Sequence, residues 1–165
     1  MKKNTLVIEN NIFTIIGSKS NIFALIFIWF LSISCFLIPL IATIYLIVSG
    51  NGFHFGMVVF FIIFWVPSAL MTRIALWNTY GKEILKLHEN TIEYIADYKF
   101  FKDGNKTFQV SEIQIEIAEI MELKNKKMWI LRITSNKEIF HTSLSLNLDE
   151  IELIYNELKT RYDFK

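Results

Sequence analysis

The longest feature in the pattern of hydrophobic and polar positions is a stretch without any charged side chain, residues 20–72. A bilayer core is about 30 Å thick, and a helix that rises about 1.5 Å per residue needs about 20 apolar residues to cross it. The stretch is long enough for two crossings, and Ser49-Gly50-Asn51-Gly52 interrupts it. We therefore predict a transmembrane helical hairpin over residues 20–81, with spans at about 22–48 and 53–77.

The N-terminal segment, residues 1–19, contains two short β-rich runs. Residues 6–8 and 12–16 hold most of its apolar side chains, and Asn10 and Asn11 between them tolerate the positive φ angles of a tight turn. This pattern predicts a β-hairpin. Because an isolated hairpin is only marginally stable in water, we expect it to join a sheet built from the chain that follows the second span.

Residues 82–165 change to the alternating apolar period of strands. The alternation predicts about six strands here, and in all a bent antiparallel sheet or barrel of about seven strands. The pair Asp103-Gly104 is a strong signal for a two-residue hairpin turn. The apolar row changes phase after Glu119, which indicates a β-bulge.

The chain closes with a predicted helix over residues 148–161. Asn147 can cap its N-terminus, and Glu150 three residues later can complete a capping box. The apolar stripe of this helix has the i, i+3, i+4 and i+7 spacing of one buried face. Its members are Ile151, Ile154, Tyr155 and Leu158. We expect the stripe to plug the open sheet, which gives residues 82–165 an α+β fold.

The charges beside the two spans predict the orientation of the hairpin. Basic residues precede the first span and follow the second, namely Lys2, Lys3, Lys19, Arg73, Lys82 and Lys86, and the connecting loop has none. The positive-inside tendency then places both termini in the cytoplasm and makes the chain a multi-pass protein of the cytoplasmic (inner) membrane. Trp77 and Tyr80 suit the inner interface, and Lys19 and Arg73 can extend toward the same headgroups.

The two prolines of the chain, Pro39 and Pro67, lie one in each predicted span. Each removes a backbone donor and crowds the preceding turn, so each is a candidate kink. In an antiparallel hairpin the two kinks would lie at similar depth. They are either matched bends that let the helices pack or a notch that receives a partner's transmembrane helix.

Charge and reactive side chains exclude several classes of function. From residue 73 onward the chain has 14 basic and 15 acidic residues, so it lacks the basic stripe of a nucleic-acid-binding protein. Its single cysteine, Cys35, lies in the first span and can form no intramolecular disulfide. The three histidines have no metal-ligand spacing, and neither a phosphate-binding loop nor a nucleophile elbow occurs. We therefore predict no enzymatic activity, no cofactor, no metal site and no nucleic-acid partner.

Two short passages carry a resemblance to a known layout. Residues 15–23 (IIGSKSNIF) lead into the first span, and residues 76–84 (LWNTYGKEI) follow the second. The chain resembles small bacterial two-span membrane proteins with a pleckstrin-homology-like cytoplasmic domain, and its layout is similar to that of the photosystem I assembly protein of plastids. The resemblance implies scaffolding or assembly work. This chain differs in having Pro67-Ser68 and Thr72-Arg73 where small, glycine-rich packing positions are usual.

The sequence favours a membrane-anchored, non-catalytic adaptor, scaffold or assembly subunit that acts through its cytoplasmic domain. Its partners would be membrane lipids and either a membrane protein or a second copy of the chain. Two alternatives remain open, an inner-leaflet domain that senses a lipid or small ligand, and an immunity-type membrane protein. A basic rim beside the bilayer would favour lipid sensing, whereas an exposed apolar patch or strand edge would favour an adaptor.

Overall fold

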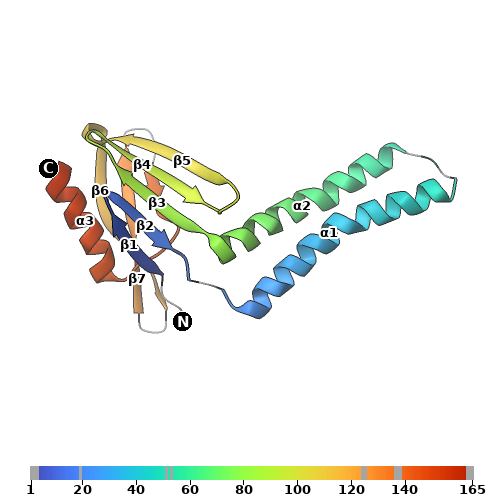
Figure 1. The fold of residues 1–165 in the computed structure, drawn as a ribbon, viewed down its shortest axis with the longest axis horizontal. Helices are drawn as coiled ribbons and strands as arrows, with labels where there is room; N and C mark the ends of the chain where they lie inside the picture. Colours follow the sequence, from blue (N-terminus) through green and yellow to red (C-terminus); the bar gives the residue numbers. More distant parts are fainter. Residues whose placement is uncertain are drawn as a thin grey trace. The chain divides into compact units, whose positions relative to one another are not determined.

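The computed structural model describes residues 4–18, 20–50, 52, 54–123, 126–135 and 139–162. The chain divides into two compact units. One unit spans residues 19–79 and is a helical hairpin. The other combines residues 1–18 with residues 80–165 and is called the β-domain below. The chain therefore leaves the β-domain, forms the helical hairpin and returns (Figure 1).

The helical hairpin consists of α1 (Ile22–Val48) and α2 (Phe55–Tyr80), and both helices are long and apolar enough to cross a membrane. Only 11% of the most apolar window of each helix is buried, so their large apolar side chains form an outer surface. Asn21 caps α1, because its side-chain oxygen accepts the backbone N–H of Phe23 at 3.1 Å. The first predicted span has the observed bounds of α1.

The second helix is displaced from its predicted bounds of 53–77, because it begins at Phe55 and ends at Tyr80. Its last turn contains the polar residues Asn78 and Thr79, which a hydropathy pattern does not assign to a membrane span. Their side chains donate to carbonyls four residues earlier, Asn78 to Ile74 at 2.9 Å and Thr79 to Ala75 at 2.7 Å. The helix then continues until Gly81, the first residue that favours its end.

Small hydroxyl residues join the two helices of the hairpin. Ser32 Oγ donates to the carbonyl of Ser68 at 3.0 Å, and Ser68 Oγ donates in return to the carbonyl of Ser32 at 2.8 Å. Thr72 Oγ1 lies 2.6 Å from Ser32 Oγ. Ser32 and Ser68 are buried, so Ser68, one of the positions that depart from the glycine-rich pattern, is itself a packing position. An interhelical hydrogen bond of this kind contributes about 0.6 kcal/mol on average.

The first sheet of the β-domain contains five antiparallel strands in the order β1-β2-β3-β4-β5. They are β1 (Thr5–Glu9), β2 (Ile12–Ile16), β3 (Lys82–Leu87), β4 (Thr91–Asp97) and β5 (Lys102–Gln109). Asn10 and Asn11 form the β1–β2 turn with φ angles of 40° and 67°, as their sequence predicts. Because β2 pairs with β3, one sheet contains strands from both sides of the helical hairpin.

The second sheet contains three antiparallel strands in the order β6-β7-β8. A short helix η1 (Val110–Glu112) leads from β5 into β6 (Ile113–Leu123), which is followed by β7 (Lys126–Ser135) and β8 (Ile139–His141). The register between β6 and β7 shifts between Glu119 and Met121, so the predicted β-bulge is confirmed. The described residues thus contain eight strands in two sheets rather than one sheet of about seven.

The predicted hairpin turn at Asp103-Gly104 is wrong. The chain turns earlier, at residues 98–101, where Lys99 has a φ of 76° and the backbone N–H of Tyr98 donates to the carbonyl of Phe101 at 3.0 Å. Asp97 decides this position, because its carboxylate accepts the backbone N–H of Lys99 at 2.7 Å. Gly104, with a φ of 61°, lies inside β5, where the register with β4 is irregular.

The C-terminal helix α3 (Leu148–Tyr162) packs on β6 and β7. Ile151, Ile154 and Leu158 of the predicted stripe are at most 1% exposed, and Tyr155 is half-buried at the margin. The backbone N–H of Asn147 donates to the carboxylate of Glu150 at 3.4 Å, which is one half of the predicted capping box. The α+β class of the β-domain is therefore confirmed.

Candidate functional site

The structure places the predicted membrane anchors on the last turns of α2. Arg73 and Tyr80 are exposed and Trp77 is half-buried, whereas Lys19 lies outside the described residues. Of the two predicted kinks, Pro39 is fully buried and Pro67 is half-buried. The side chain of Pro39 is thus covered by its own chain, whereas that of Pro67 is partly open.

The two connections between the helical hairpin and the β-domain meet at a pair of glycines. The backbone N–H of Gly17, which follows β2, donates to the carbonyl of Gly81, which precedes β3, at 3.3 Å. A Cβ added to Gly17 would lie 3.3 Å from the Gly81 oxygen and 3.4 Å from a methyl group of Leu144. The close approach therefore favours glycine at position 17, since a larger residue would push these neighbours apart by a few tenths of an ångström.

Glu83 holds the two sheets together at this end of the β-domain. Its side chain is fully buried, and its Oε1 accepts the hydroxyl of Tyr94 at 2.5 Å and the backbone N–H of Ser143 at 2.6 Å. Its Oε2 accepts the backbone N–H of Leu144 at 3.0 Å. Glu83 and Tyr94 belong to the first sheet, whereas Ser143 and Leu144 follow β8 of the second. One carboxyl group thus satisfies donors from both sheets.

Burial raises the pKa of Glu83 above its ordinary value, although its three hydrogen bonds act in the opposite direction. The same burial and the nearby Glu83 carboxylate raise the pKa of Tyr94. Burial therefore shifts the titration of both groups toward higher pH. Ser143 and Leu144 lie 60 and 61 residues from Glu83 in the chain, so sequence patterns did not indicate this cluster.

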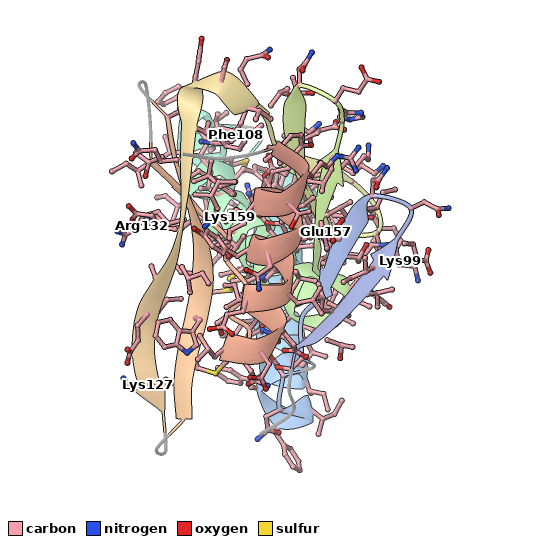
Figure 2. The ribbon with its side chains drawn as sticks, turned by 90° about the vertical axis from the view of Figure 1, so that its left-hand side faces the viewer. Lys99, Phe108, Lys127, Arg132, Glu157 and Lys159 are labelled. Atoms are coloured by element: carbon pink, nitrogen blue, oxygen red, sulfur yellow. The ribbon has the colours of Figure 1, made fainter. Side chains whose placement is uncertain are left out.

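The β-domain contains a groove of about 1180 Å³ between β6, α3 and the corner where β5 passes into β6. One wall is the start of the β6–β7 pair, with Ile113, Gln114, Ile115 and Glu116 on β6 and Thr134 and Ser135 on β7, and the other is α3 with Tyr155, Lys159 and Tyr162. Figure 2 shows Lys159 on the side of α3 that faces β6, whereas Glu157 lies on its opposite side. The groove lies wholly within the β-domain.

The wall formed by β6 is a strand edge. Within the described residues β7 is the one strand that pairs with β6. Ile113 and Ile115 are buried while Gln114 and Glu116 are exposed, yet all four consecutive residues line the groove. A sheet face alone would contribute only alternate residues, so the groove also reaches the backbone at the start of β6, while Thr134 and Ser135 of β7 line it as well. Every second residue there directs its N–H and C=O away from β7.

An open strand edge beside a helix can bind an extended peptide as an additional strand. Four residues of strand extend about 13 Å, at about 3.3 Å per residue. The walls carry both charge signs, Glu112 and Glu116 against Lys159, so backbone pairing rather than net charge would dominate recognition. The bulge after Glu119 disturbs the rest of β6 and limits the regular edge to its first residues.

The chain has no match among protein-family models, curated proteins or solved structures. In the parts of the chain that the structure describes, no three His, Cys, Asp or Glu side chains gather as they would around a metal ion. The groove was not predicted from the sequence. The alternation of Ile113 and Ile115 with Gln114 and Glu116 indicates a half-buried strand, but it does not tell whether that strand is central or at an edge.

Proposed function

We propose that this protein is a membrane-anchored, non-catalytic adaptor or assembly subunit. The helices α1 and α2 hold it in the cytoplasmic membrane with both termini in the cytoplasm, and the β-domain binds an extended segment of a protein partner at the edge of β6. The observation that carries the proposal is the groove between that edge and α3. The pairing of the partner's backbone with β6 would provide affinity, and the groove walls would select its side chains.

Two sheets and a C-terminal helix that covers one of them support a pleckstrin-homology-like relationship for the β-domain. The N-terminal β-hairpin precedes the helical hairpin in the chain and pairs with β3, which follows it. The β-domain would therefore be joined to the membrane helices by two chain segments. The lysines on both flanks of the uncharged stretch support the cytoplasmic orientation. An adaptor anchored in this way would hold a bound segment close to the inner leaflet.

The test compares two tryptophan substitutions on α3 that differ in the direction of the side chain. Lys159→Trp adds a large ring to the groove wall, whereas Glu157→Trp adds the same ring outside the groove. Both positions are exposed, so both variants should fold. The full chain is purified in mild detergent from its own membranes, and the proteins that accompany it are identified by mass spectrometry.

We expect the wild-type protein and Glu157→Trp to retain the same partner, and Lys159→Trp to lose it. Hydrogen exchange then locates the contact, because the outward backbone amides of residues 113–116 should become protected when the partner is present. Retention of the partner by both variants, with unchanged exchange at residues 113–116, would refute binding at the β6 edge.

A further inference from the structure

The turn between β4 and β5, residues 98–101, presents aromatic side chains at the surface of the β-domain. Phe100 is 69% exposed and Phe101 is 40% exposed. By contrast, Phe13 and Phe108 in the same domain are 1% and 4% exposed. A patch of exposed aromatic side chains on a domain that buries Phe13 and Phe108 indicates a surface that contacts something apolar.

Hydrogen bonds hold this turn in one conformation. The Asp97 carboxylate accepts the backbone N–H of Lys99 at 2.7 Å, and the backbone N–H of Tyr98 donates to the carbonyl of Phe101 at 3.0 Å. The rings of Tyr98 and Phe101 stack with their centroids 4.5 Å apart. The backbone that carries Phe100 is therefore already ordered. Little conformational entropy would be lost when the Phe100 side chain enters an apolar environment.

The turn lies beside the end of the second candidate span. The register of β3 and β4 places Asp97 opposite Lys82, and Lys82 follows the last residue of α2, Tyr80, by two positions. The ring of Phe100 meets the ring of Tyr80 edge-on with centroids 5.9 Å apart, and the Lys99 ammonium lies 4.4 Å from the Tyr80 centroid. Phe100 and Lys99 thus surround the residue at which the helix ends.

The length of α2 locates this contact relative to a bilayer. Its 26 residues span about 39 Å at about 1.5 Å per residue, which exceeds a hydrocarbon core of about 30 Å. A helix that crosses the core therefore continues into the headgroup layer at its ends. Tyr80 belongs to that layer, and a ring 5.9 Å away from it is within reach of the same layer.

We infer that residues 98–101 form a second membrane anchor, in which Phe100 and Phe101 enter the boundary between headgroups and acyl chains. Lys99 and the exposed Lys102 beside it would contact anionic headgroups of that leaflet. The inference rests on the part of the proposed function in which α1 and α2 cross the bilayer. The anchor would hold the β-domain against the membrane that its own helices cross, and would limit its rotation about the two connections.

The test measures lipid and water accessibility of spin labels on the full chain in vesicles of phosphatidylcholine and phosphatidylglycerol. One protein carries the label at Lys102→Cys and a second carries it at Glu157→Cys on α3, both in a Cys35→Ala background. The native Cys35, half-buried in α1, is labelled in a third protein as the reference for the spans. Collisions with oxygen report the lipid phase, and collisions with a water-soluble nickel complex report the aqueous phase.

We expect oxygen to dominate at Cys35 and nickel to dominate at position 157, and we expect the ratio of oxygen to nickel collisions at position 102 to be clearly higher than at position 157. Adding Phe100→Ser to the protein labelled at position 102 should shift that label toward nickel and leave the label at position 157 unchanged. Nickel access at position 102 equal to that at position 157, with Cys35 still in lipid, would overturn the anchor alone. Nickel access at Cys35 would overturn both the spans and the anchor. Dipolar broadening between labels at position 102, without oxygen access, would identify a second copy of the chain and would also overturn the inference.

Discussion

Glu83 is an acidic residue whose side chain belongs to the core, and its three donors explain how the β-domain tolerates it. Burying a carboxyl group without hydrogen-bond partners would destabilise the fold by several kcal/mol, and each hydrogen bond that it accepts offsets part of this loss. Tyr94 belongs to the first sheet, and Ser143 and Leu144 belong to the segment after β8, so the carboxyl group also fixes that segment to the first sheet. At the scale of single residues, Glu83 is a buried polar group that links the first sheet to the segment after β8.

The raised pKa of Glu83 predicts how stability depends on pH. Between its ordinary pKa of 4.5 and its higher folded value, the folded protein keeps the proton that the unfolded chain has lost. Unfolding then releases a proton, so the free energy of unfolding should fall as pH rises through this window, by at most about 1.4 kcal/mol per pH unit. Thermal melting of the strand signal in detergent micelles, followed by circular dichroism from pH 4.5 upward, measures this decline.

Two variants at the same position separate charge from hydrogen bonding. Glu83→Gln cannot ionise and retains an acceptor. The melting temperature of this variant should therefore not show the decline that the wild type shows as pH rises. Glu83→Leu leaves the hydroxyl of Tyr94 and two backbone N–H groups without acceptors, at about 1–3 kcal/mol for each buried group, and should be the less stable variant at every pH. A pH dependence of Glu83→Gln equal to that of the wild type would show that another group controls stability.

The C-terminal helix shows at the scale of elements how one surface divides between core and groove. Ile151, Ile154 and Leu158 are buried, whereas Tyr155 and Lys159 line the groove. The stripe that predicts an amphipathic helix therefore ends at a margin that faces the β6 edge.

Truncating the buried stripe should destabilise the β-domain. Ile154→Ala or Leu158→Ala removes apolar contacts and leaves a cavity, which typically costs about 2–5 kcal/mol. The exposed change Glu157→Ala on the same helix should alter stability by only about 0.5 kcal/mol. Chemical denaturation of the full chain in micelles gives both values. If the Ile154 and Leu158 variants unfold at the wild-type midpoint but lose a partner, the stripe is a binding surface instead of a core.

At the scale of the whole molecule, the pairing of β2 with β3 constrains how the chain can insert into a membrane. β2 precedes α1 and β3 follows α2, and both strands belong to one sheet. If the helices cross a bilayer, both connections must emerge on the same side. The sheet requires the two connections to share one side, and we expect from the flanking basic residues that this side is the cytoplasmic one.

Cysteine accessibility tests the choice of side. In a Cys35→Ala background, His54→Cys lies at the end of the loop, directly before α2, and Glu157→Cys lies on α3. Both positions are exposed, and neither has the positive φ that makes substitution of Gly52 or Gly104 unfavourable. In intact cells an impermeant maleimide should label position 54 and spare position 157 until the cells are lysed. Labelling of position 157 in intact cells would reverse the proposed orientation.

The sequence alone determined the elements whose signals are local. The uncharged stretch located both long helices, Asn10 and Asn11 located a turn, and the phase change after Glu119 located a bulge. The residues that carry each of these signals are close together in the sequence, so the sequence pattern is sufficient to locate the element. The end of α2 and the β4–β5 turn were misplaced, because polar side chains that bond to nearby backbone, in Asn78, Thr79 and Asp97, outweighed the general pattern.

Only the tertiary structure decided which residues meet across the chain. The hydrogen bonds of Glu83 to Ser143 and Leu144 span 60 and 61 residues, and the contact of Phe100 with Tyr80 joins a turn to the end of a helix. Whether β6 is an edge likewise depends on which strand occupies its other side. A strand's own residues specify the face that it buries, but they do not specify its neighbours, because pairing is set by the packing of the whole domain.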